Sequence, residues 1–278
     1  MSRIARTFAT LKRDNRAAFV PFVTGGDPDF ETSCEILAKL PGAGADIIEL
    51  GIPFSDPMAD GPINQASYLR ALKGGMTLVK LVEMVRRFRK IHDGTPVVLM
   101  GAYNPIHAYG TARFMKDAAE AGVDGLLIVD VPAEEDEVLR VPASVHGIDV
   151  LRFLAPTTDD TRLPVVLQNA SGYLYYASIA GITGTKSFAE GEVRAALARI
   201  RARTALPVAV GFGIKTPEQA GAIARFADGA VVGSAIVARI ESHAGKGASR
   251  AEIVADVVEF CVALAKSVHA ARESSVLG

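Results

Sequence analysis

The stretch that organises the chain is residues 46–61, DIIELGIPFSDPMADG. It begins with a short apolar run that ends on the carboxylate of Glu49, and Gly and Pro follow closely, which is typical of a buried strand meeting its loop. Asp60 lies eleven positions after Glu49, so only a folded-back loop brings the two carboxylates together. Two carboxylates in different surroundings are the usual equipment of acid/base catalysis. The alternative interpretation is a solvated acidic loop with Glu49 in a structural ion pair.

Outward from this stretch, apolar strand patterns alternate with helical patterns along the whole chain. Eight strands are expected, within residues 18–29, 47–49, 96–101, 124–130, 148–154, 172–178, 206–210 and 228–232. Alternating strands and helices predict a parallel sheet. Eight such units at this length predict a closed (β/α)₈ barrel, of the TIM-barrel α/β class, in a single domain over residues 1–278. A doubly wound open sheet is the alternative architecture.

A separate amphipathic pattern precedes the first strand. Residues 2–13 place Ile4, Phe8 and Leu11 on one helical face, with basic residues elsewhere. We expect an N-terminal capping helix docked on the barrel; a targeting or membrane-surface helix is the alternative.

The composition argues against several classes of function. Charge nearly cancels, with 30 basic and 31 acidic residues, so net charge does not favour binding to nucleic acid or to a membrane surface. Cys34 and Cys261 form no spaced motif and indicate thiols of an intracellular protein. The five histidines lack paired spacing, which argues against a metal site. No apolar run suits a signal peptide or a membrane span, so a soluble, cytoplasmic protein is expected.

Active sites of (β/α)₈ barrels lie at the C-terminal ends of the strands. Glu49 and Asp130 are the carboxylates expected there. The strand cores hold no Lys for a Schiff base, and no His for a metal-dependent aldolase lies at a strand end, so carboxylate acid/base chemistry is expected. Glycines after the last two strands, in GFGI at 211–214 and GSAIV at 233–237, favour phosphate binding through backbone N–H groups. Gly184 in GITG offers a third such group.

From about residue 2 to the last helix, the chain resembles the tryptophan synthase alpha chain family. The motifs that carry the resemblance are FVPFVTGGDPD at 19–29, ELGIPFSDPMADGP at 49–62, LIVDVP at 127–132, APTT at 155–158, GITG at 181–184 and GFGI at 211–214. The resemblance implies a (β/α)₈ lyase that splits indole-3-glycerol phosphate into indole and glyceraldehyde 3-phosphate.

The resemblance also assigns roles to residues of this sequence. It implies that Glu49 is the general acid/base and that Asp60 holds the indole N–H. The resemblance implies that Phe22 and Phe212 line the indole pocket and that Tyr175 and Thr183 match the family's strand-six Tyr and mobile-loop Thr. It further implies a phosphate site formed by backbone groups of Gly184, Gly213, Gly233 and Ser234.

The resemblance implies a partner as well: a beta chain that carries pyridoxal phosphate, in an α₂β₂ complex. No cofactor is expected in this chain. The loop with Asp56 and Asp60 is rich in Pro and Gly, and Asp56 is expected to couple the loops to the partner without taking part in the chemistry.

Two other functions share some of these features. One is another phosphate-binding barrel, an isomerase or synthase with different acids at its strand ends; the second is a non-catalytic regulatory subunit that binds the phosphate ester. Three features depart from the family pattern: Ala102 where many relatives carry an aromatic residue, the segment TKSFAEGE at 185–192, and Arg152 inside the fifth strand, for which the sequence suggests no role.

Overall fold

The parallel strands close into a barrel. The computed structural model describes residues 1–178, 190–211 and 213–275. Its sheet has the order β5-β4-β3-β2-β1-β9-β8-β7-β6, and every strand pair is parallel. The strands are β1 (Ala18–Thr24), β2 (Ile48–Gly51), β3 (Val97–Gly101), β4 (Gly125–Ile128), β5 (Asp149–Val150), β6 (Arg152–Leu154), β7 (Leu174–Ala177), β8 (Val208–Gly211) and β9 (Gly229–Val232).

The strands at the two ends of that order, β5 and β6, follow each other in the chain and are separated only by Leu151. They are therefore two halves of one strand. The sheet therefore ends where it begins, and the barrel has the eight strand positions that the sequence predicts. The (β/α)₈ prediction is confirmed, and the open doubly wound alternative is wrong because no edge remains between β5 and β6.

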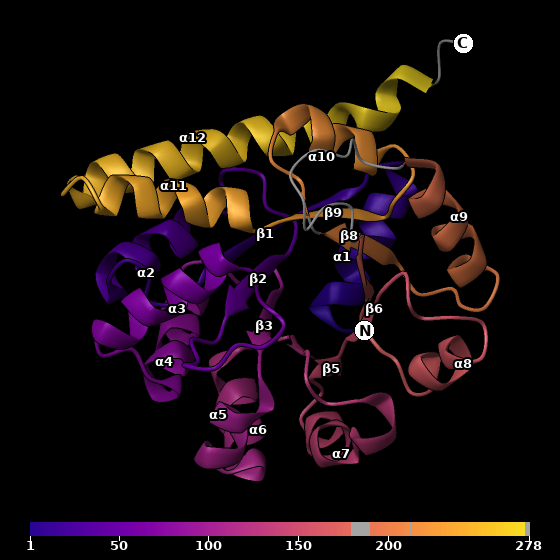
Figure 1. Ribbon diagram of the computed structural model, residues 1–278, viewed down its shortest axis with the longest axis horizontal. Coiled ribbons are helices and arrows are strands. Elements are labelled where there is room, and N and C mark those ends of the chain that lie inside the picture. The colour runs from indigo at the N-terminus through magenta and orange to yellow at the C-terminus, as the bar shows by residue number, and fades with distance from the viewer. Residues whose placement is uncertain (179–189, 212, 276–278) are drawn as a thin grey trace.

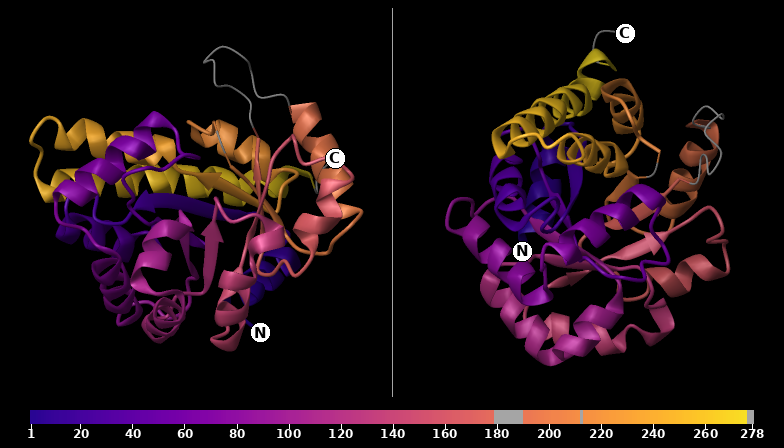
Figure 2. Two further views of the ribbon diagram at one scale, coloured as in Figure 1. Left: turned by 60° about the horizontal axis from the view of Figure 1, so that its bottom comes forward. Right: turned by 60° about the vertical axis from the view of Figure 1, so that its left-hand side comes forward.

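Helices surround the barrel (Figure 1). They are α1 (Arg3–Arg13), α2 (Phe30–Lys39), α3 (Pro62–Lys73), α4 (Leu78–Arg89), α5 (Tyr103–Tyr109), α6 (Thr111–Ala121), η1 (Ala133–Glu135), α7 (Glu137–Val145), α8 (Arg162–Leu167), α9 (Glu190–Arg201), α10 (Pro217–Ala224), α11 (Ser234–Ala244), α12 (Arg250–His269) and η2 (Ala270–Ser275). Figure 2 shows α11 and α12 lying side by side along one flank. In the described ranges no helix is long and apolar enough to cross a membrane.

Two helices differ from the sequence-based expectation. Helix α5, after β3, was not expected, because its Asn-Pro pair and the following Gly110 are typical of a loop. The sequence pattern predicts a helix over residues 65–73, but helix α3 begins three residues earlier, at Pro62. Proline is suited to the first position of a helix, because the N–H that it lacks would have no acceptor within the helix. This earlier start brings the first turn of α3 next to Asp60.

Alternation along each strand separates two buried layers. Leu174 and Tyr176 of β7 join the core between strands and helices, whereas Tyr173, Tyr175 and Ala177 join the core inside the barrel. The interior core contains the site described below.

The capping helix is also confirmed. Ile4, Phe8 and Leu11 of α1 are buried in the interior core, and the Phe8 ring lies 5.6 Å from that of Tyr173. Ser2 accepts a hydrogen bond from the Ala5 N–H and so caps the helix. The helix closes the N-terminal end of the barrel and lies behind the strands in Figure 1.

The structure accounts for Arg152. Its side chain points toward the helix layer, is only 6% exposed, and forms an ion pair with the buried Asp136. Asp136 also accepts a hydrogen bond from Arg140 one helical turn away. Arg152 therefore joins β6 to the start of α7, on the side of the strand away from the barrel interior.

Candidate active site

One cavity brings together most of the predicted site residues that the structure describes. Its volume is about 240 Å³. It lies at the C-terminal ends of the strands, where the barrel class places its chemistry. Its predicted lining residues are Phe22, Glu49, Asp60, Tyr175, Gly213, Gly233 and Ser234. Three further predicted residues, Thr183, Gly184 and Phe212, lie outside the described residues.

Glu49 forms the floor of this cavity. Ile48 and Leu50 point outward into the strand–helix core, so Glu49 points into the barrel, in register with Phe22 and Val98 of the neighbouring strands. Its side chain is fully buried. Burial raises the pKa of Glu49 to about 7, which makes this carboxyl able both to hold and to release a proton near neutral pH.

The two carboxyl oxygens of Glu49 have different surroundings. The Tyr173 hydroxyl donates a hydrogen bond to Oε1 at 2.5 Å, which stabilises the ionised form and partly offsets the effect of burial on the pKa. Oε2 is buried and has no hydrogen-bond partner in the described part of the chain. No arginine or lysine of the described residues pairs with Glu49, so they give no support to the interpretation of this residue as half of a structural ion pair.

Asp60 lies at the mouth of the cavity, just before α3. Asn64, one turn into the helix, donates a hydrogen bond from its amide to Asp60 Oδ1 at 3.1 Å. Gln65 donates to the Asp60 backbone carbonyl at 2.8 Å. Burial raises the pKa of Asp60, while the hydrogen bond from Asn64 and the nearby Tyr68 hydroxyl oppose that rise. The folded-back loop thus brings the second carboxylate to the cavity that Glu49 lines.

Aromatic rings form the walls. Tyr175 stacks on Phe153, with ring centroids 5.2 Å apart and planes at 11°. Space for Tyr175 depends on Gly211, because a Cβ there would lie 2.0 Å from its hydroxyl. Phe22 packs against Gly51, where a Cβ would lie 2.7 Å from its ring. The glycines at these strand ends therefore make room for two aromatic side chains inside a narrow barrel.

Backbone N–H groups border the other side of the cavity. Gly233 is the N-cap of α11 and Ser234 its first residue, and no side chain caps this helix end. The first N–H groups of a helix lack intrahelical acceptors and carry the positive end of the helix dipole, so an anion fits there. Gly213 has φ +79°, a conformation that favours glycine, and Lys215 adds a cation to the lining.

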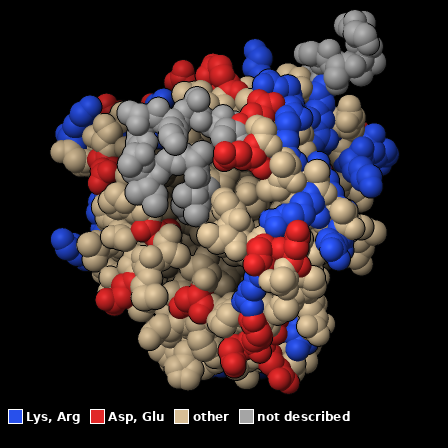
Figure 3. Space-filling view, turned by 45° about the vertical axis from the view of Figure 1, so that its right-hand side comes forward, with Lys and Arg blue, Asp and Glu red and all other residues tan. Residues whose placement is uncertain are grey.

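Asp56 does not reach this cavity. Its exposed carboxylate accepts a hydrogen bond from Ser55 at 2.5 Å. It lines a neighbouring space of about 650 Å³ together with Ala102 and Asp130. Asp130, one of the two expected strand-end carboxylates, accepts a hydrogen bond from the Tyr103 N–H at 2.8 Å, at the start of α5, and does not line the Glu49 cavity. Figure 3 shows a hollow lined mainly by uncharged side chains, with acidic side chains on its left and both acidic and basic ones on its right.

Sequence reasoning missed three polar residues of the site: Tyr173, Asn64 and Tyr68. The alternation of β7 would have placed Tyr173 inside with Tyr175. Asn64 and Tyr68 lie four residues apart on the first turns of α3, and the late expected start of this helix concealed that spacing. No group of three or more His, Cys, Asp or Glu side chains suited to a metal ion occurs among the residues that the structure describes.

These features define a class of protein. A (β/α)₈ barrel that holds a buried carboxyl with a pKa near neutrality, a second carboxylate and an uncapped helix N-terminus has the groups that an acid/base enzyme needs to act on a small phosphorylated substrate.

Comparison with known proteins identifies the family. A model of the tryptophan synthase alpha chain family matches residues 8–269. The tryptophan synthase alpha chain of Gluconacetobacter diazotrophicus is 54% identical over 273 residues, which cover 98% of this chain and 100% of the relative. The chain belongs to the tryptophan synthase alpha chain family.

Solved structures support the same family membership. The crystal structure of tryptophan synthase subunit alpha from Legionella pneumophila is similar with a TM-score of 0.89 at 38% identity, covering 96% of this chain and 98% of that chain. The aminoacrylate-bound form of tryptophan synthase from M. tuberculosis is similar with a TM-score of 0.85 at 29% identity, covering 97% and 100%.

Proposed function

We propose that Glu49 and Asp60 perform the alpha reaction in this chain, the cleavage of indole-3-glycerol phosphate to indole and glyceraldehyde 3-phosphate in L-tryptophan biosynthesis. The lyase reaction itself follows from family membership. The residue assignment rests on one observation above all: a fully buried Glu49 whose pKa is about 7, in the cavity that Asp60 also lines.

The reaction needs one proton delivered and one removed. Protonated Glu49 gives its proton to C3 of the indole ring, which makes the ring an electron-accepting indoleninium ion. The resulting Glu49 carboxylate then takes the proton of the hydroxyl on the adjacent glycerol carbon. The bond from that carbon to C3 breaks, its electrons return to the ring, and the carbon becomes the aldehyde of glyceraldehyde 3-phosphate. Glu49 ends protonated, so a single carboxyl with a pKa near neutrality serves both steps.

Asp60 is proposed to stabilise the positive charge that develops on the indole nitrogen. Its position at the cavity mouth suits an acceptor for the indole N–H, and the amide of Asn64 holds the carboxylate in one orientation. Phe22 and Tyr175 are proposed to bind the indole ring, together with Phe212.

The substrate phosphate is proposed to bind at Gly213, Gly233 and Ser234, with help from Gly184. Support comes from the uncapped start of α11 and from the positive φ of Gly213, both on the same cavity as Glu49. Thr183 is proposed to act at this site from the loop after β7.

Family membership implies a beta-chain partner. We further propose an α₂β₂ complex in which the partner holds pyridoxal phosphate, this chain holds no cofactor, and indole passes directly to the partner. The exposed loop around Asp56, with Met58 92% exposed, is the proposed contact region. We also propose a cytoplasmic location and one barrel domain over residues 1–278.

The test is an indole-release assay on indole-3-glycerol phosphate, run with and without a tryptophan synthase beta chain, with complex formation checked by sedimentation. We expect indole release by the chain alone and a higher rate in the complex. Asp56→Ala should reduce the stimulation more than the basal rate, because its carboxylate does not reach the Glu49 cavity. No indole release from either sample would favour a regulatory subunit or another barrel enzyme. A complex that forms without a change in rate would refute loop closure by the partner.

A further inference from the structure

A second cavity, called the side cavity below, adjoins the Glu49 cavity at the same end of the barrel. Its volume is about 650 Å³, within the roughly 300–1,000 Å³ of small-molecule sites, whereas the Glu49 cavity, at about 240 Å³, is below that range. Asp60 lines both cavities, so its side chain lies at the boundary between them.

The two cavities share walls as well as Asp60. Met100 of β3 lines the Glu49 cavity, and the two residues that follow it in the chain line the side cavity. Tyr68 of α3 lines the side cavity and belongs to the same interior core as Phe22. A Cβ on Gly51 would lie 2.7 Å from the Phe22 ring and 3.3 Å from the Tyr68 ring, so the two rings approach each other at this glycine.

Ala102 leaves the side cavity open next to β3. It is half-buried, and it follows the strand as the N-cap of α5 with φ −90° and ψ 157°, an ordinary extended conformation. A larger side chain at this position would therefore need no change of the backbone. Its neighbour Gly101 leaves no such space, because a Cβ there would lie 2.8 Å from the Cβ of Ile52. The size of residue 102 thus sets the space beside the end of β3.

The lining of the side cavity is apolar and acidic. Its apolar surface includes Ile52, Phe54, Met58 and Val129. Its charged residues, all within the described part of the chain, are the three acids Asp56, Asp60 and Asp130, without Lys or Arg. An uncharged apolar group therefore fits this space, whereas a negatively charged one is repelled.

The orientation of the indole ring determines which of its edges faces the side cavity. In the proposed reaction, C3 lies at Glu49 and the ring N–H at Asp60. Carbon 4 of the ring lies on the side of C3, whereas carbons 6 and 7 lie on the side of the nitrogen. Because Asp60 is at the boundary between the cavities, carbons 6 and 7 are the positions nearest the side cavity.

We propose that the side cavity makes this chain accept indole rings with a small uncharged substituent at carbon 6 or 7, and that Ala102 is the residue that sets this specificity. The inference rests on the proposed function, because it uses the orientation of the ring between Glu49 and Asp60. It excludes a carboxylate at carbon 6, which the three acids repel.

The test uses the cleavage in reverse. C3 of indole attacks the aldehyde carbon of glyceraldehyde 3-phosphate while protonated Glu49 gives its proton to the aldehyde oxygen, and the resulting carboxylate removes the proton from C3. The loss of free indole gives kcat/KM for indole, 6-methylindole, 7-methylindole and indole-6-carboxylate. We expect at least one methylindole to react within about threefold of indole, and the carboxylate to react at least ~10-fold less well.

The decisive variant is Ala102→Phe, whose ring would occupy the space beside β3. The ratio of kcat/KM for the better methylindole to that for indole should fall by at least ~10-fold, because one methyl group in an apolar pocket changes discrimination by about that much. Ala102→Leu, a smaller change, should lower the same ratio by an intermediate factor.

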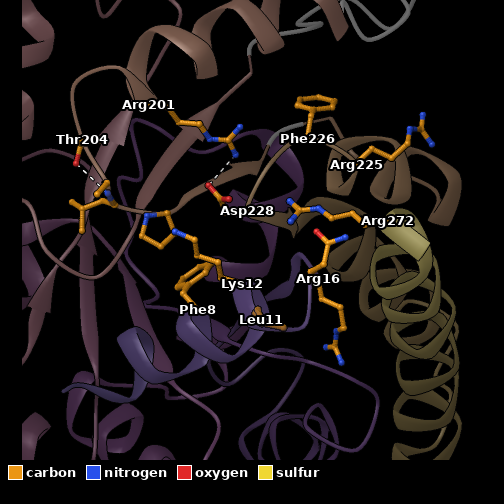
Figure 4. A pocket seen from close by; sticks show the side chains of 14 residues that line it. Phe8, Leu11, Lys12, Arg16, Arg201, Thr204, Arg225, Phe226, Asp228 and Arg272 are labelled. Atoms are coloured by element: carbon orange, nitrogen blue, oxygen red, sulfur yellow. Dashed lines mark hydrogen bonds and ion pairs between the residues drawn. The ribbon is translucent and has the colours of Figure 1, made fainter. Parts of the chain in front are cut away.

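The matched control is Ala205→Phe. It makes the same substitution in a cavity at the opposite end of the barrel, before β8 and β9, which shares no lining residue with the other two (Figure 4). This variant should keep the ratio of the unaltered chain.

Two results would overturn the inference and leave the proposed function in place. One is an equal ratio in the Ala102 variants and the control; the other is a kcat/KM for both methylindoles below a tenth of that for indole in the unaltered chain. No condensation of indole itself, with or without the beta chain, would overturn the proposed function and this inference with it.

Discussion

Two buried carboxyl groups of this protein are compensated in opposite ways. Asp136, between β6 and α7, forms an ion pair with Arg152 and accepts a second hydrogen bond from Arg140. Glu49, inside the barrel, has only the Tyr173 hydroxyl, and its Oε2 lacks any partner in the described ranges. A paired buried carboxylate stays charged and fixes structure, whereas an unpaired one is driven toward its neutral form. The comparison explains why chemistry is assigned to Glu49 and not to Asp136.

The largest expected effect is on the structural pair. Asp136→Ala leaves the Arg152 guanidinium buried without its partner, and losing one partner of a buried pair costs about 3–5 kcal/mol. Urea unfolding of the variant should show this loss. The matched control is Glu134→Ala, which breaks the exposed pair with Arg162 nearby and should cost about 1 kcal/mol or less. Equal losses in the two variants would show that the Asp136 pair is no more structural than a surface pair.

The next largest effect concerns the contribution of Glu49 to the free energy of unfolding. Its pKa is about 7 in the folded chain against an ordinary 4.5, so the folded state binds more protons than the unfolded state between these values. Stability from this group is therefore full below pH 4.5 and is lost as pH rises through 7, by roughly 3 kcal/mol.

Glu49→Gln removes this pH dependence. The free energy of unfolding of the variant, relative to the unaltered chain, should rise by roughly 3 kcal/mol from pH 4.5 to pH 8, as measured by urea unfolding at each pH. A difference that does not change with pH would show that Glu49 is ionised in the folded chain throughout this range.

The position of Glu49 inside the barrel could be predicted from the sequence, because it follows from strand alternation. The pattern of residues 47–50 places Glu49 inside the barrel. The glycines after the last two strands predict an anion site, which stays a prediction. The Arg152–Asp136 pair could not be predicted, since the pairing of a strand residue with a helix start depends on how the layers pack. The hydrogen bond from Tyr173 to Glu49 joins residues 124 positions apart and has no local sequence pattern.

A smaller effect is expected at the proposed phosphate site. Gly213→Val places a side chain where φ is +79° and where backbone N–H groups are proposed to face the phosphate. Binding of glycerol phosphate should weaken by at least ~10-fold, while binding of free indole should change little. Isothermal titration with each ligand measures both, and equal loss for the two ligands would indicate misfolding or a wrong site.

The smallest effect concerns the hydrogen bond of Glu49. Tyr173→Phe keeps the ring beside Phe8 but removes the donor that stabilises the ionised carboxylate, so the pKa of Glu49 should rise further, by up to about one unit. The fall of kcat/KM at high pH, which reports loss of the proton from Glu49, should shift upward accordingly. Tyr176→Phe, on the opposite face of β7, is the control and should leave the profile in place.

The central claim is that Glu49 carries the proton, and indole release by Glu49→Gln tests it most directly. Glutamine preserves the shape of the side chain but cannot donate or accept the proton. We expect turnover of indole-3-glycerol phosphate to fall by at least ~10²-fold, with binding of glycerol phosphate retained. A variant that binds this ligand and keeps more than about a tenth of the activity would contradict the account.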